Sequence, residues 1–208
     1  MNPAMPRRPS ARPPRPTPSG GGSRAVVLFN KPFGVLCQFS ADGSGKPTLA
    51  DFVSLPGVYP AGRLDADSEG LVVLTGDGAL QARIADPRHK LEKVYRIEVE
   101  GVATPEQLAA LAAGVALGDF VTAPARARRI AEPPGLWPRD PPIRVRRAIP
   151  TCWLEVAIRE GRNRQLRRMT AAVGLPTLRL IRWAVGPWTL DGLPPGAVRT
   201  GVAPTGVV

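Results

Sequence analysis

Short runs of apolar residues, separated by turn-forming residues, recur along most of the chain. Their length and their β-branched and aromatic content are typical of β-strands. Within the run 93–99, Tyr95, Ile97 and Val99 lie on one apolar face. Tyr95 is there either as a core aromatic or as part of a site. The strands predicted in this way cover residues 25–29, 71–75, 93–99, 151–158, 178–183 and 185–190.

Two stretches between these strands carry the end signals of α-helices. Asp77 is suited to cap a helix that ends before Pro87. Thr104 and Gln107 form a capping box at the start of another helix, which Gly114 ends. The strands outnumber the helices and are joined mostly by short turns. The pattern predicts an α+β fold with a mixed, largely antiparallel sheet flanked by helices and loops.

A third helix is predicted between Asn163, a suitable N-cap, and Gly174, a suitable C-terminal residue. Arg167 lies beside the buried stripe of this helix. A buried arginine needs a partner, because an unpaired buried charge is very costly. Asp65 is the candidate partner. The buried stripe consists of Leu166, Met169 and Val173.

The predicted folded part is one domain over residues 25–208. Residues 1–24 are rich in proline and arginine and contain few large apolar residues, so we expect a disordered tail rather than an S4 RNA-binding domain. Residues 124–150 are again rich in proline and arginine, and predict a long surface excursion, as an RNA-contacting loop or a tolerated insertion.

The charge balance favours a polyanionic partner. The chain of 208 residues has a net charge of +11, and the part after the tail keeps +6. Such a basic fold is typical of nucleic-acid-binding proteins, although charge also serves solubility. Two cysteines and one histidine cannot supply the four ligands of an ordinary structural zinc site, so we expect no metal. No apolar run approaches the ~20 residues that span a bilayer, so we expect a cytoplasmic protein with no membrane partner.

The loop before the predicted strand 71–75 concentrates charged residues. Arg63 is followed by three carboxylates, Asp65, Asp67 and Glu69. Loops on a rigid scaffold often hold catalytic groups, so one carboxylate could act as nucleophile or base; a solvated acidic turn is the alternative. Lys31 lies at the end of the predicted strand 25–29.

Four motifs in order along residues 25–200 resemble those of the pseudouridine synthases, in the branch that includes ribosomal small-subunit pseudouridine synthase A. Without an S4 domain, the chain is most similar to members of that branch that modify a uridine in 23S rRNA. The resemblance implies the pseudouridine synthase fold, with an active-site cleft across the sheet. The motifs are Asn30–Gly34, Gly62–Leu71, Lys93–Tyr95 and Glu160–Met169.

The resemblance also implies roles for individual residues. Asp65 corresponds to the family's catalytic aspartate, and Arg63 to the arginine that helps hold the target nucleotide out of the helix. Tyr95 would stack on the target base, and Leu166 and Arg167 correspond to the last motif, whose arginine pairs with the aspartate. The basic residues expected to contact RNA are Lys31, Arg162, Arg164 and Arg168.

The implied reaction breaks the N1–C1′ bond of uridine and forms a C5–C1′ bond. It removes no group and oxidises nothing, so we expect neither a metal nor a cofactor, and a monomer bound to ribosomal RNA. A non-catalytic rRNA-binding or ribosome-assembly factor would explain the charge equally well, but would leave Asp65 without a purpose. A glycosidase is a poorer alternative, because the surroundings are basic.

Overall fold

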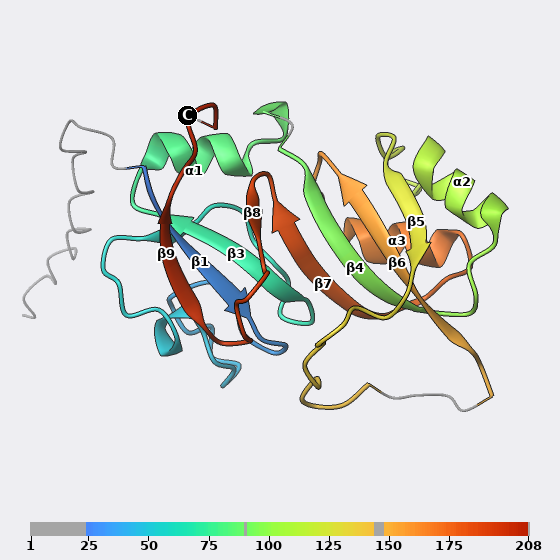
Figure 1. Cartoon of the computed structure of the whole chain (residues 1–208), viewed down its shortest axis with the longest axis horizontal. Helices are drawn as coiled ribbons and strands as arrows, with labels where there is room; N and C mark the ends of the chain where they lie inside the picture. The colour runs from blue at the N-terminus through green and yellow to red at the C-terminus, as the bar shows by residue number, and fades with distance from the viewer. Residues whose placement is uncertain (1–23, 90, 144–147, 208) are drawn as a thin grey trace, which may run out of the picture.

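The computed structural model describes residues 24–89, 91–143 and 148–207. Within these residues nine strands form one sheet, whose main path runs β5-β6-β4-β7-β3-β1-β9 (Figure 1). β3 and β7 pair in parallel and the other strand pairs are antiparallel, which confirms the predicted mixed, largely antiparallel α+β fold. The strands are β1 (Ala25–Lys31), β2 (Tyr59–Pro60), β3 (Glu69–Thr75), β4 (Lys93–Glu100), β5 (Arg126–Ile130), β6 (Thr151–Ile158), β7 (Thr177–Val185), β8 (Trp188–Thr189) and β9 (Val198–Val202).

Three α-helices are described, and they lie beside different parts of the sheet (Figure 1). They are α1 (Gly78–Ala85), α2 (Pro105–Ala113) and α3 (Gln165–Ala172), with two short 3-10 turns at Leu49–Asp51 and Pro87–His89. α1 contacts β3, α2 contacts β5 and α3 contacts β7. None of the described helices has the length and apolar character needed to cross a membrane.

Two apolar clusters cover the two faces of the sheet. Successive residues of β1 point to opposite faces: Val27 and Phe29 belong to one cluster, Val26 and Leu28 to the other. β3 is buried along its whole length for the same reason. This explains why both strands are continuous apolar runs rather than alternating ones.

The helix ends follow the predicted chemistry except at α3. The Asp77 carboxylate accepts hydrogen bonds at the start of α1, and Thr104 and Gln107 form the capping box of α2. The N-cap of α3 is Arg164, not Asn163. Arg164 has left-handed backbone angles (φ 50°, ψ 28°) and its side chain does not cap the helix. Gly174, with φ 80°, follows the helix as expected.

Two edge strands were not predicted. β5 lies within the stretch expected to be a surface excursion, and β9 follows the last predicted turn. Both lie at the ends of the sheet and are largely exposed, so they lack a continuous apolar run. The expected disordered tail, apart from Arg24, lies outside the described residues.

Candidate active site

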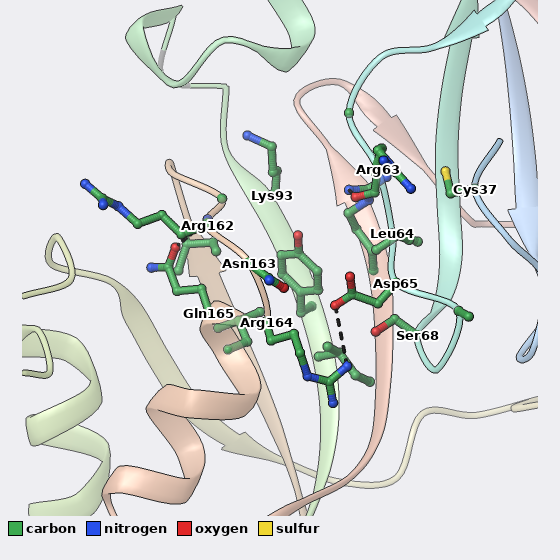
Figure 2. Close-up of a pocket in the computed structure, with 18 of the residues that line it drawn as sticks. Cys37, Arg63, Leu64, Asp65, Ser68, Lys93, Arg162, Asn163, Arg164 and Gln165 are labelled. Atoms are coloured by element: carbon green, nitrogen blue, oxygen red, sulfur yellow. Dashed lines mark hydrogen bonds and ion pairs between the residues drawn. The ribbon is translucent and has the colours of Figure 1, made fainter. Parts of the chain in front are cut away.

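A cavity of about 620 Å³ lies between segments that are far apart in the sequence. Its walls come from the loop before β3, from β4 and β7, and from the segment that leads into α3 (Figure 2). Six of the predicted site residues line it together: Arg63, Asp65, Tyr95, Arg162, Arg164 and Leu166. Lys31, Arg167 and Arg168 do not line it.

Lys31 supports the loop that carries Asp65 through hydrogen bonds to backbone carbonyl groups. Its ammonium donates to the carbonyls of Pro32 (3.0 Å), Val35 (2.8 Å) and Ala66 (3.5 Å). Burial lowers the pKa of Lys31 to about 8. The side chain is fully buried, so the expectation that Lys31 contacts RNA is wrong. Its hydrogen bonds make it a support of the loop instead.

Arg182, which the sequence reasoning missed, ties the two ends of the same loop together. Its Nε donates to the carbonyl of Leu71 at 2.7 Å and its Nη1 to that of Arg63 at 3.3 Å. The parallel pairing of β3 with β7 brings Gly70 onto the backbone of Arg182. A Cβ on Gly70 would lie 2.4 Å from the Arg182 carbonyl oxygen, so only glycine allows this approach.

Asp65 is the one carboxylate among the described residues that line the cavity. Its side chain is 44% exposed, and Arg164 Nη1 lies 3.9 Å from its Oδ2 (Figure 2). The carboxylate therefore has a positive charge beside it and access to the cavity, as a positioned nucleophile or base requires.

Arg167 pairs with Asp67, so the predicted pairing with Asp65 is wrong. Arg167 Nη2 donates to the Asp67 carbonyl at 2.6 Å, and its Nε lies 3.5 Å from the Asp67 carboxylate. Arg164 Nη2 donates to the same carboxylate at 2.8 Å. Burial acts to raise the pKa of Asp67, but the hydrogen bond from Arg164 and the charge of Arg167 outweigh it, and the pKa lies below its usual value. Asp67 is therefore paired with two arginines.

The third carboxylate of the loop, Glu69, is buried away from the cavity. It accepts two hydrogen bonds of 2.8 Å from Arg179, and a third of 2.9 Å from the Trp137 indole. Trp137 belongs to the predicted surface excursion, so part of that segment packs on the domain. Of the three carboxylates, Asp65 is thus the one that faces the cavity without a close ion pair.

The apolar wall of the cavity includes Tyr95 and Leu166. Both also belong to the core cluster on this face of the sheet, so Tyr95 is at once a core aromatic and a cavity residue. Arg63 lies at the exposed side, where its Nη2 donates to Gln38 at 3.4 Å. A flat apolar wall beside a carboxylate can accommodate a planar base and its sugar.

Two of the expected RNA-binding arginines contact one aromatic ring. The Arg162 guanidinium lies 4.2 Å from the centre of the Phe120 ring, and that of Arg168 lies 5.3 Å from it. Arg168 also forms an ion pair with Asp119 and donates to the Leu117 carbonyl at 2.6 Å. Arg162 and Arg164 line the cavity, whereas Arg168 does not and is held by Asp119 and the Leu117 carbonyl.

Lys93 is a further cavity residue that was not predicted from the sequence, although a signal was present. Lys93 lies two residues before Tyr95, and residues two apart on a strand share a face. Arg182 gave no such signal, because it sits within an apolar run whose partner strand could not be known.

Comparison with known proteins supports the resemblance found in the motifs. The family described as RNA pseudouridylate synthase matches residues 25–172. Ribosomal large subunit pseudouridine synthase E of Xanthomonas axonopodis pv. citri is 62% identical over 172 residues, which cover 82% of this chain and 90% of the relative. Ribosomal small subunit pseudouridine synthase A of Salmonella typhimurium is 37% identical over 178 residues, covering 83% of this chain and 68% of the relative.

A solved structure shows the same fold. The crystal structure of a pseudouridylate synthase superposes with a TM-score of 0.69 at 29% identity, over 86% of this chain and 71% of that chain. The region that matches the family model contains three of the segments that build the cavity, namely the loop of Asp65, β4 and the start of α3, whereas β7 follows it. The chain belongs to the RNA pseudouridylate synthase family.

Proposed function

We propose that this protein isomerises one uridine of 23S ribosomal RNA to pseudouridine, with Asp65 as the catalytic carboxylate. The observation that carries the role of Asp65 is its place as the sole carboxylate among the described cavity-lining residues. The large-subunit substrate is supported by the name of the relative that is 62% identical. We further propose that it acts as a monomer in the cytoplasm.

A uridine within folded RNA has to be extruded before it can reach Asp65. Enzymes that act on a base extrude it into a pocket, and pockets for ligands of this size measure about 300–1,000 Å³. The cavity of about 620 Å³ lies within this range. Tyr95 would contact the face of the uracil, Leu166 would fill the other side, and Arg63 would contact the RNA at the cavity mouth.

The reaction then needs one positioned carboxylate. Asp65 either attacks C1′, displacing the uracil through its N1, or removes the 2′ proton to give a glycal and free uracil. In the first route C5 of the turned uracil attacks C1′ and the Asp65–C1′ bond breaks. In the second, C5 bonds to C1′ of the glycal as Asp65 returns the proton to C2′. In both, the C5 proton is released as N1 gains one. Nothing is oxidised and no group is lost. Arg164 places a guanidinium 3.9 Å from the Asp65 carboxylate.

A pseudouridine map of ribosomal RNA tests this proposal. Cells that lack the gene should lose one pseudouridine in 23S rRNA, and wild-type protein should restore it. The Asp65→Asn variant should not restore it. An unchanged map in the deleted strain would refute the 23S substrate and would favour a non-catalytic assembly role.

A further inference from the structure

Two cationic side chains on neighbouring strands line the cavity, and neither has a carboxylate partner among the described residues. They are Lys93 of β4 and Arg182 of β7, which are 8% and 3% exposed. Both line the cavity, and Figure 2 shows Lys93 among the side chains around it. Neither residue has a role in the isomerisation described above.

The polar partners of both side chains, within the described part of the chain, are neutral. Lys93 Nζ donates to the Leu91 carbonyl at 3.3 Å. Arg182 donates to two carbonyls through Nε and Nη1, and its buried Nη2 has no hydrogen-bond partner. Arg179, on the same strand and equally buried, instead pairs with Glu69 through two hydrogen bonds. Among the described residues, a carboxylate thus balances the charge of Arg179, whereas none balances the charge of Arg182.

Such an arrangement is costly for the free protein. Burial, and then the charge of Arg182, lower the pKa of Lys93. Buried charges normally carry a counter-ion, and a buried donor without a partner in a native structure calls for an explanation. An anion that enters the cavity would supply both the opposite charge and the missing acceptor.

The position of the two cations indicates which anion this is. Lys93 and Tyr95 share a face of β4. Their Cα atoms are about 6.6 Å apart along the strand, at roughly 3.3 Å per residue. Arg182 is the cross-strand partner of Tyr95. The cations therefore flank the ring that contacts the target base. The uracil carbonyls there are neutral, whereas the phosphodiester attached to the target ribose carries a full negative charge.

We propose that Lys93 and Arg182 form a buried anion subsite that binds a phosphodiester group adjoining the flipped uridine. The inference rests on the proposed function, because it needs RNA in this cavity. It adds a contact that holds the nucleotide by its backbone, independent of the base, while Asp65 acts on the sugar. Phosphate contacts position a nucleic acid and carry no sequence information, so the subsite contributes affinity rather than choice of site.

Lys93→Met is the informative variant, because it removes the charge and keeps much of the side-chain length. RNA affinity should fall about tenfold, and the slope of log K against log salt should become shallower by about 0.7, as for one phosphate contact on a single strand. The melting temperature should stay the same or rise, because an uncompensated buried charge is removed. Lys46→Met is the matched control: Lys46 is exposed and does not line the cavity, so affinity should change little.

A neutral methylphosphonate next to the target uridine identifies the group that is bound. The probe is an RNA oligonucleotide carrying the mapped uridine, with the substitution on its 5′ or its 3′ side. One of the two should weaken binding to the wild type about tenfold and have little further effect on Lys93→Met. Equal losses in both proteins at each position, an unchanged salt slope, or a lowered melting temperature of Lys93→Met would overturn the inference. Isomerisation of the unmodified oligonucleotide by the wild type tests the proposed function separately.

Discussion

Arg164 is held in a left-handed backbone conformation. Different substitutions at this position should therefore change the stability of the protein by different amounts while lowering its activity to a similar extent. Among the described residues Arg164 is the one non-glycine residue with positive φ. This conformation turns the chain into α3 and places the guanidinium between Asp65 and Asp67. Arg164→Gly should therefore relieve the backbone while removing the cation beside Asp65.

The magnitude follows from comparing Arg164→Gly with Arg164→Ala. Both variants lose the ion pair with Asp67, which is half-exposed and contributes about 0–1 kcal/mol. The left-handed conformation costs an L-residue roughly 1–2 kcal/mol, and glycine avoids this cost. The greater freedom of glycine in the unfolded chain, however, lowers the free energy of unfolding by about 0.5–1 kcal/mol. Arg164→Gly should thus be more stable than Arg164→Ala by about 1 kcal/mol.

Urea denaturation measures this difference, and single-turnover isomerisation of the target RNA measures activity. Both variants should lose activity to a similar extent, because both lose the guanidinium near Asp65. If Arg164→Gly proved less stable than Arg164→Ala, the left-handed conformation would not be a cost. If either variant kept wild-type activity, Arg164 would not be the cation that Asp65 requires.

Further predictions concern the buried charges and the tight contact behind the loop. The folded protein releases the Lys31 proton near pH 8 and the unfolded chain near pH 10.5, so unfolding free energy should rise between these pH values by up to about 3 kcal/mol. Lys31→Met should lack this rise in urea titrations, and parallel pH curves would refute it. Glu69→Gln should cost about 3–5 kcal/mol in the same assay, because it leaves Arg179 buried and unpaired; a loss below about 1 kcal/mol would contradict the pairing. Gly70→Ala should cost about 2–4 kcal/mol through backbone strain and collision with β7, whereas Gly62→Ala, with open space at its Cβ, should cost about 1–2 kcal/mol; equal losses would argue against the collision.

The sequence was sufficient for elements whose signals are local. The strands buried on both faces are continuous apolar runs, and the caps of α1 and α2 depend on side chains a few residues apart. The cavity walls could also be anticipated, because the motifs that build them resemble those of a family. Edge strands β5 and β9 could not, since they are exposed and gain their hydrogen bonds from distant partners.

The details of the site depended on contacts that no local pattern encodes. Asp65 and Asp67 lie in one acidic loop, and the sequence alone could not tell which of them Arg167 contacts. Asn163 is the better N-cap by residue type, but Arg164 takes that position, and its side chain pairs with Asp67 instead of capping the helix. Lys31 sits at a strand end that is exposed in many proteins; here the loop covers it.

The central claim is that Asp65 performs the chemistry, and one comparison tests it most directly. Wild type, Asp65→Asn and Asp67→Asn are each incubated in excess with the 23S rRNA fragment that carries the target uridine, and pseudouridine is quantified over time. Asp65→Asn should bind the RNA with affinity near that of the wild type and form no pseudouridine. Asp67→Asn, two residues away in the same loop, should react more slowly yet measurably. Pseudouridine formation by Asp65→Asn at the wild-type rate would contradict the account.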